Sequence, residues 1–268
     1  YVEISTYFSS KDGTQIPITY SYKSSIEINS RTPVFLYGYG GYNISIRPSF
    51  TPKYVAWLEM GGVLAVANLR GGGELGKSWH DAGRLDTKQN GFDDFLYAAK
   101  FLEDKSIGNR KTTVISGRSN GGLLVGATLV QNPDYFGAAL PAVGVLDMLR
   151  FTEFTEGWGW RGDYGSPLLN REDFARNIKI SPYHQLKIDE CYSPTLTTTG
   201  RRDDRVVPSH SYKFTARLQE YQGCNNPVLL YDAPRAGHGS GNGVAMPKWK
   251  RIKLFSIEQA FALKHVSS

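Results

Sequence analysis

Thr113 to Val125, read as TVISGRSNGGLLV, is the stretch of sequence that decides the fold. Its β-branched start predicts a buried strand and its apolar end opens a helix. Between them Gly117-x-Ser119-x-Gly121 is the Gly-x-Ser-x-Gly pattern of a nucleophile elbow. The serine backbone in such a turn is strained, so that the hydroxyl projects above the sheet edge. The backbone N–H of Asn120 then falls at the helix start, where it can donate to a developing oxyanion.

The alternative interpretation is a glycine-rich strand-to-helix turn that happens to contain a serine. Five-residue patterns of this kind recur by chance, so the serine needs partners elsewhere in the chain. An activated serine requires an imidazole, and the imidazole requires a carboxylate that orients it and stabilises its charged form.

The imidazole is predicted to be His238. Of five histidines, it is the one in a loop, residues 235–241, just beyond the last predicted strand. That is the position expected of the base in an α/β hydrolase.

The carboxylate should follow a strand that lies between the serine and the histidine in the chain. After a predicted strand at residues 195–199 come Asp203 and Asp204. The order Ser119, Asp203, His238 is the α/β-hydrolase order. The alternative is a charged turn in which Asp204 and Arg205 form a surface ion pair.

The rest of the chain predicts an α/β fold: a mostly parallel central sheet, an antiparallel N-terminal hairpin and helices on both faces. The hairpin pairs residues 1–8 with 16–22, and the chain of 268 residues is expected to form one domain. Further strands are predicted at residues 33–37, 63–67, 138–143 and 227–231, and further helices at 51–60, 90–102, 209–221 and 247–264. In the last of these helices Ile252, Phe255 and Phe261 are expected to face inwards.

Composition excludes several classes of function. A net charge of +6 is mild, and the one dense basic group, at residues 248–253, is expected to be a solvated helix face rather than a nucleic-acid patch. Cys191 and Cys224 lie in no metal-binding pattern, so we expect no metal and no cofactor. The two cysteines suit a reducing compartment, which favours a cytoplasmic location. No apolar run approaches membrane-spanning length and no signal peptide is visible, and we expect a monomer without membrane partners.

One motif favours a different enzyme. Residues 71–78, GGGELGKS, satisfy the P-loop pattern, and Asp232 after an apolar run could hold magnesium, so a nucleotide hydrolase is an alternative. A P-loop needs its lysine and serine to open a helix. Residues 79–84 have no apolar periodicity and contain Gly83, so we expect an irregular loop there.

Taken together, these motifs resemble those of the catalytic domain of the prolyl oligopeptidase family, whose members are serine peptidases with an α/β-hydrolase fold. The likeness runs along nearly the whole chain and is carried by residues 36–45, 62–74, 119–122, 203–208 and 236–239. It implies that residues 1–268 form the peptidase domain and that the family's β-propeller is absent from this chain. It also implies an endopeptidase that cleaves short peptides after proline through an acyl-enzyme.

The resemblance implies a role for each site residue. Ser119 would be the nucleophile, His238 the base and Asp203 the acid, while the Tyr39 hydroxyl and the Asn120 amide would bind the oxyanion. Arg205 resembles the family arginine that binds a substrate carbonyl. The proline pocket would comprise Tyr42, Val145, Trp160, Tyr164 and Val206.

The sequence departs from the family pattern at three places. Arg118 stands where many members have glycine, and Tyr42 replaces a common phenylalanine. Gly200-Arg201-Arg202 replaces Ala-Asp-His, and two added positive charges should favour the ionised form of Asp203. Besides the nucleotide hydrolase, the alternatives are an esterase, an acyl-transferring or peptide-macrocyclising relative, or an inactive excised domain.

Overall fold

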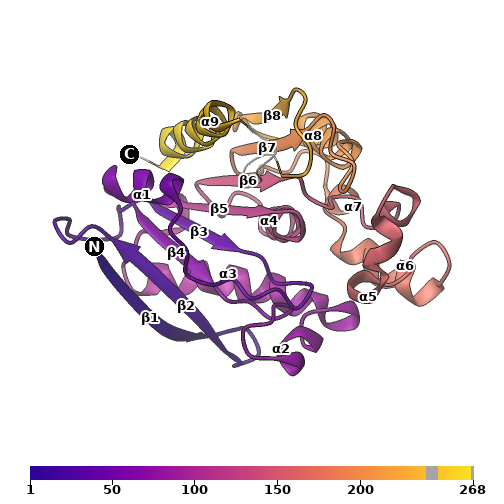
Figure 1. Ribbon diagram of the computed structural model, residues 1–268, viewed down its shortest axis with the longest axis horizontal. Helices are drawn as coiled ribbons and strands as arrows, with labels where there is room; N and C mark the ends of the chain where they lie inside the picture. The colour runs from indigo at the N-terminus through magenta and orange to yellow at the C-terminus, as the bar shows by residue number, and fades with distance from the viewer. Residues whose placement is uncertain (240–246, 267–268) are drawn as a thin grey trace.

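The computed structural model describes residues 1–239 and 247–266. These residues form one eight-stranded sheet with helices packed against it (Figure 1). The strands are β1 (Val2–Ser9), β2 (Gln15–Tyr22), β3 (Val34–Gly38), β4 (Val63–Ala67), β5 (Thr113–Arg118), β6 (Ala138–Ala142), β7 (Thr195–Gly200) and β8 (Val228–Ala233). Their order across the sheet is β1-β2-β4-β3-β5-β6-β7-β8. β1, β2 and β4 pair antiparallel, and all pairs from β4 to β8 are parallel. The predicted mostly parallel sheet with an antiparallel hairpin is therefore confirmed.

Helices cover both faces of the sheet, as predicted (Figure 1). α3, α4 and α8 contribute to the larger buried cluster, and α1 and α9 to the cluster on the other face. The helices are α1 (Pro52–Glu59), α2 (Lys77–Asp81), α3 (Lys88–Asp104), α4 (Asn120–Gln131), α5 (Arg161–Tyr164), α6 (Arg171–Ile180), α7 (Pro182–Gln185), α8 (Ser209–Tyr221) and α9 (Lys248–Val266).

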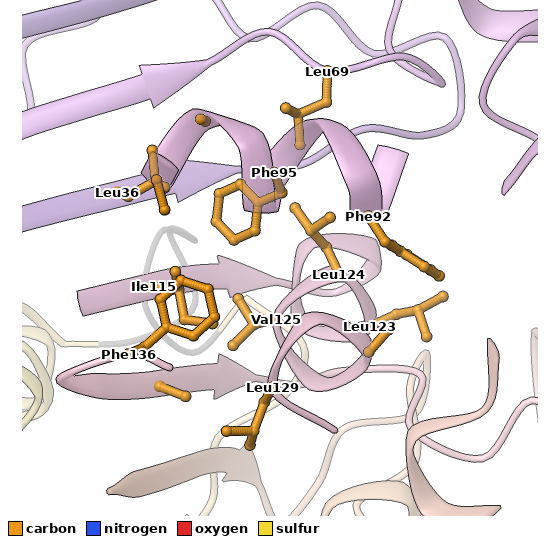
Figure 2. Close-up of a cluster of buried hydrophobic side chains, with 14 of the residues drawn as sticks. Leu36, Leu69, Phe92, Phe95, Ile115, Leu123, Leu124, Val125, Leu129 and Phe136 are labelled. Atoms are coloured by element: carbon orange, nitrogen blue, oxygen red, sulfur yellow. The ribbon is translucent and has the colours of Figure 1, made fainter. Parts of the chain in front are cut away.

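The core is densest around β5 and α4, the two elements joined by the elbow. Residues 120–130 of α4 are all buried, which explains why this helix is apolar on every side. Figure 2 shows Phe95 of α3 and Leu124 of α4 in the same cluster as Ile115 of β5. The elbow therefore connects a central strand to a fully buried helix, and neither can shift without disturbing the packing.

The inward face of α9 differs from the prediction. Ile252 is 54% exposed, whereas Leu254, Phe261 and Val266 are buried. The expectation for Ile252 was wrong because the helix turns its Leu254 and Phe261 side toward the sheet. Within residues 1–239 and 247–266, no helix is both long and apolar enough to cross a bilayer.

The two cysteines are joined in a disulfide, Cys191–Cys224, with their Cα atoms 5.1 Å apart. The interpretation of these residues as thiols of a reducing compartment was therefore wrong. Their separation of 33 residues in the chain carried no pairing signal, and the fold brings them together. Disulfides persist in oxidising environments, so the cysteines do not favour a cytoplasmic location.

A buried ion pair fastens the hairpin to α3. Arg70, after β4, donates from Nη2 to Asp94 Oδ1 at 2.6 Å and from Nε to Asp94 Oδ2 at 3.0 Å. Its guanidinium also pairs with Asp12 in the β1–β2 turn, and Ser10 Oγ donates to Asp94. The Arg70 and Asp94 side chains are 5% and 0% exposed, so neither charge is solvated if the other is removed.

We therefore predict that Arg70→Met destabilises the fold by about 3–5 kcal/mol, because it leaves the Asp94 carboxylate buried without its partner. The double variant Arg70→Met/Asp94→Leu should recover part of that loss, since it removes the orphaned charge. Urea unfolding of the three proteins checks both statements. Equal stabilities of wild type and Arg70→Met would contradict the prediction.

Candidate active site

Ser119 lies at the junction of β5 and α4 in a backbone conformation that non-glycine residues rarely adopt, with φ 58° and ψ −118°. Its N–H donates to the carbonyl of Ala142 at 2.9 Å, which fixes the turn against β6. Gly117 is required for a different reason: a Cβ atom there would lie 2.2 Å from the carbonyl oxygen of Gly121. This strained turn is the geometry of the nucleophile elbow.

His238 and Asp203 are hydrogen-bonded, with 2.8 Å between His238 Nδ1 and Asp203 Oδ2. Asp203 Oδ1 accepts from the backbone amides of Arg205 at 3.1 Å and Val206 at 2.9 Å. The Asp203 side chain is fully buried, so these amides replace the water that would otherwise solvate it. With Nδ1 bonded to a carboxylate, the imidazole leaves Nε2 for proton transfer with a serine hydroxyl.

The loops that carry Asp203 and His238 are held together by their backbones. β7 and β8 are parallel neighbours, and the loops leave them at the same edge of the sheet. The amide of Arg202 donates to the carbonyl of Ala236 at 2.9 Å. A Cβ atom on Gly200 would lie 2.5 Å from that same carbonyl oxygen, so only glycine permits the approach. Ser240 and Gly241, which were assigned to the histidine loop, lie outside the described residues.

Arg201, one of the two added positive charges, and Arg205, which resembles the family arginine, are directed away from Asp203. Arg201 pairs with Asp232 through Nη2 at 2.7 Å, and Arg205 pairs with Glu156 through Nε at 3.4 Å. Asp204 is therefore not the ion-pair partner of Arg205. The Asp203 carboxylate accepts from two backbone amides, while the guanidinium groups of Arg201 and Arg205 pair with other carboxylates.

The two predicted oxyanion donors lie after different strands, Tyr39 after β3 and Asn120 at the start of α4. Tyr39 follows β3, and its hydroxyl shares a hydrogen bond with the Ser119 side chain. Burial raises the pKa of Tyr39 to about 12, so the phenol keeps the proton that it would donate. Asn120 is the first residue of α4, and the amide of a first helical residue has no partner within the helix.

The side chain of Asn120 lies inside a buried polar network that the sequence interpretation missed. Asn120 Nδ2 donates to the carbonyl of Tyr39, while Asn120 Oδ1 accepts from Tyr164 Oη at 2.7 Å and Lys88 Nζ at 3.0 Å. One signal in the sequence pointed to this lysine. Lys88 precedes Phe92 and Phe95 by four and seven residues, so it lies on the apolar face of its helix.

Three of the five residues assigned to the proline pocket, Tyr42, Tyr164 and Trp160, lie in one aromatic group through Phe151. Val145, Tyr164 and Val206 are buried in the main apolar cluster, and Tyr42 and Trp160 are half-buried against it. The rings of Tyr42 and Tyr164 meet edge to face with centroids 5.6 Å apart. Trp160 lies parallel to Phe151 at 6.2 Å, and Phe151 in turn packs on Tyr164. The result is an aromatic wall that leaves the indole of Trp160 partly accessible.

Two other histidines have structural partners. His80 Nε2 lies 3.1 Å from Asp163 Oδ1, and the other oxygen of Asp163 accepts from the amide of Tyr42. His210 is buried, and its Nδ1 accepts from the amide of Asp147 at 3.1 Å. In the described part of the chain, no three side chains of His, Cys, Asp or Glu gather in a group able to hold a metal ion.

The P-loop pattern does not have P-loop geometry, although the expectation of an irregular loop was partly wrong. A short helix, α2, begins at Lys77, because the carbonyl of Gly76 accepts from the amides of Trp79 and His80. The Lys77 side chain is 81% exposed and pairs with Asp81 instead of curling over the loop. Asp232 lies on β8, the outermost strand on one side of the sheet, whereas the loop of residues 71–78 follows β4 nearer the other side. Asp232 is therefore too far away to complete a magnesium site at that loop.

Known proteins resemble this chain in sequence. The model of the prolyl oligopeptidase family matches residues 48–268. The prolyl endopeptidase of Elizabethkingia meningoseptica is 47% identical over 257 residues, which is 96% of this chain and 36% of that protein. The dual function macrocyclase-peptidase POPB of Amanita bisporigera is 42% identical over 240 residues, or 88% of this chain and 33% of that protein.

A solved structure extends the comparison to three dimensions. A variant of prolyl oligopeptidase B from Galerina marginata, bound to a 35mer hydrolysis and macrocyclization substrate, superposes with a TM-score of 0.93 at 37% identity. The match covers 99% of this chain and 37% of that one, so the chain spans about a third of the length of its relatives. The predicted α/β-hydrolase fold is confirmed.

We predict that Ser119 reacts with a fluorophosphonate probe and that Ser119→Ala abolishes the labelling. Asp203→Asn should retain the fold, because its amide oxygen can still accept from Arg205 and Val206. Its labelling rate should fall on the order of 10³-fold or more, since the imidazole loses its charged partner. Equal labelling of wild type and Ser119→Ala would contradict the assignment of the nucleophile.

A second prediction concerns acid stability. Burial lowers the pKa of His210 to about 4 from 6.5, with the Asp147 carboxylate and the Lys213 ammonium as its charged neighbours. Between these values the unfolded chain binds a proton that the folded chain does not, so stability falls as the pH falls through this window. The loss should reach about 3 kcal/mol below the folded pKa.

His210→Asn keeps an acceptor toward Asp147 and removes the titrating group. Urea unfolding of both proteins between pH 7 and pH 4 should therefore give a shallower loss of stability for the variant. If the free energy of unfolding fell equally in both proteins over this pH range, His210 would not be the cause of the acid destabilisation.

Proposed function

Because this chain belongs to the prolyl oligopeptidase family, we propose that it is a serine endopeptidase domain that hydrolyses peptides on the carboxyl side of proline. The observation that carries the proposal is the hydrogen bond of 2.8 Å between His238 and Asp203 beside the strained turn of Ser119. A surface serine needs neither a left-handed backbone nor a buried acid–base pair. A nucleophile that is deprotonated during attack needs the acid–base pair, and the strained turn is how an α/β hydrolase exposes its serine.

In the proposed reaction, Ser119 Oγ attacks the carbonyl carbon of a proline residue while its proton passes to His238 Nε2. The carbonyl oxygen becomes an oxyanion that accepts from the Tyr39 hydroxyl and the Asn120 amide. When the tetrahedral species collapses, the C–N bond breaks and His238 protonates the leaving amine. Water then attacks the acyl-enzyme by the same route, and Ser119 regains its proton.

The preference for proline is supported by the chemistry of the aromatic wall. A pyrrolidine ring is rigid and apolar, so it loses little conformational freedom when it stacks on a flat indole such as Trp160. Val206 belongs to the same cluster and directly follows Arg205, whose side chain is 57% exposed. Arg205 is thus a candidate donor to a substrate carbonyl next to the proline.

A second candidate reaction is transfer of the acyl group to a peptide amine. A relative of 42% identity is named a dual function macrocyclase-peptidase, whereas relatives of 47% and 45% identity are named prolyl endopeptidases, which favours hydrolysis. The two reactions share every step up to the acyl-enzyme and differ only in whether water or an amine attacks it. Mass spectrometry of products from a long proline-containing peptide separates hydrolysed from cyclised or ligated chains.

The proline preference is tested with Trp160→Ala. Cleavage of a chromogenic peptide with proline before the scissile bond should fall about 10- to 200-fold in kcat/KM, because one apolar wall of the pocket is lost. Hydrolysis of a p-nitrophenyl ester, which does not use the pocket, should change little. Trp158→Ala is the matched control, since Trp158 lies in the same segment but is 65% exposed.

Trp158→Ala should leave both rates near those of the wild type. An equal loss of peptide and ester hydrolysis in Trp160→Ala would contradict a role in binding proline. An active wild type without preference for proline would support the esterase or acyl-transferring alternative.

A further inference from the structure

A buried ammonium lies directly beneath the predicted oxyanion site. Lys88, the first residue of α3, is 2% exposed, and burial lowers the pKa of its side chain to about 8 against the opposing pull of the Asp163 carboxylate. Burying an ammonium costs free energy unless its N–H groups find partners. A hydrophobic residue at this position would avoid that cost, so the partners of Lys88 indicate what the charge does.

The partners of Lys88 belong to the two segments that carry the oxyanion donors. Nζ donates to the carbonyl of Gly40 at 2.9 Å and to Asn120 Oδ1 at 3.0 Å. Gly40 is the residue after Tyr39. The ammonium also lies 5.5 Å from the centre of the Tyr164 ring, within the range of a cation–π contact.

The same two segments touch each other at a second point. Asn120 Nδ2 donates to the carbonyl of Tyr39. A Cβ atom on Gly41 would lie 2.5 Å from Asn120 Nδ2, so the loop after β3 packs directly on this side chain. The loop after β3 and the start of α4 are therefore joined directly through Asn120 and indirectly through Lys88. The contacts of Lys88 are the only ones of these that involve a charged group.

We propose that Lys88 is a positioning residue that sets the Tyr39 hydroxyl and the Asn120 amide at the spacing a single oxyanion requires. The inference deepens the proposed function and rests on it. Lys88 is not a catalytic residue, because its contacts are with Gly40, Asn120 and Tyr164 and not with Ser119. Its effect reaches the reaction through the two donors.

Loss of Lys88 should weaken the stabilisation of the transition state by the two oxyanion donors. They stabilise the transition state because they already point at the place where charge will develop. Without Lys88, the loop after β3 and the start of α4 would lose their shared anchor, and the donors would sample spacings that fit one oxygen less well. Substrate binding before attack would change little, so the loss should appear in kcat rather than in KM.

The experiment uses Lys88→Met, which keeps the length of the side chain and removes its charge and donors. Its kcat for the proline peptide and for the p-nitrophenyl ester should fall on the order of tenfold to a hundredfold, with KM nearly unchanged. A loss confined to KM, or no loss in kcat, would overturn the proposal.

A pair of inhibitors gives a readout that a merely structural role would not move. With a peptide aldehyde ending in prolinal, Ser119 Oγ bonds to the aldehyde carbon, the C=O electron pair moves onto oxygen, and the Ser119 proton passes to His238. The resulting hemiacetal oxyanion needs both donors. The matching peptide that ends in pyrrolidine fills the pocket but has no carbonyl to attack. Lys88→Met should weaken the binding of the aldehyde alone, by the same factor by which kcat falls. Equal weakening of the binding of both ligands would overturn the proposal.

Lys53→Met is the matched control for the loss of a buried lysine. Burial lowers the pKa of Lys53 to about 8 as well, but its ammonium lies over the rings of Tyr54 and Phe255 and not against Gly40 or Asn120. It should leave kcat and aldehyde affinity unchanged. If Lys53→Met lowered kcat as much as Lys88→Met, the effect would be one of general stability and the proposal would be wrong.

Asn120→Ala provides an independent variant if Lys88→Met does not fold. It retains the backbone amide but removes Oδ1, the atom that Lys88 holds, and the same selective loss of aldehyde affinity is expected. Unchanged aldehyde affinity in Asn120→Ala would overturn the proposal. The ester and fluorophosphonate reactions do not require proline, so a wild type that shows neither reaction refutes the proposed function itself, separately from the role of Lys88.

Discussion

The contact between Gly117 and Gly121 is the constraint on which the site depends. The backbone of the strand end approaches the helix start so closely that a side-chain atom at Gly117 would lie 2.2 Å from a carbonyl oxygen. This approach turns the chain sharply enough to hold Ser119 at a positive φ, a conformation that costs on the order of 1–3 kcal/mol. The buried packing of β5 and α4 on both sides of the turn supplies the stability that maintains it.

Parallel strands then bring the other groups to the same place. Tyr39 follows β3, Ser119 follows β5, Asp203 follows β7 and His238 follows β8. Because these strands run in one direction within one sheet, their carboxyl ends share an edge, and ligands of open α/β sheets bind beyond that edge. Tyr39 and His238, which are separated by 199 positions in the chain, are thereby brought to the same edge of the sheet.

Two buried cations, Arg70 and Lys88, join segments that are distant in sequence. Arg70 links the turn of the N-terminal hairpin to α3 through Asp12 and Asp94. Lys88 links the loop after β3 to the start of α4. Apolar side chains could fill the same volumes at a lower cost of desolvation, but they would not specify one relative position of the backbones they join. The second link, through Lys88, holds the backbone in place and, in the proposed function, also positions the groups that bind the oxyanion.

The amino-acid sequence by itself determined the strands, the helices α1, α3, α4, α8 and α9, the elbow and the order Ser119, Asp203, His238, because these are local patterns or chain-order rules. It did not reveal the helices α5, α6 and α7, which lie in a segment without clear periodicity. It could not determine which face of α9 packs inward, that Cys191 pairs with Cys224, or that a helix starts at Lys77. Those outcomes depend on neighbours supplied by other parts of the chain. The network of Lys88, Asn120 and Tyr164 belongs to the same class. Only the tertiary structure placed that lysine against Gly40 and Asn120, beside the predicted oxyanion donors, since a charge on an apolar helix face has no visible partner until the sheet brings its loops together at one edge.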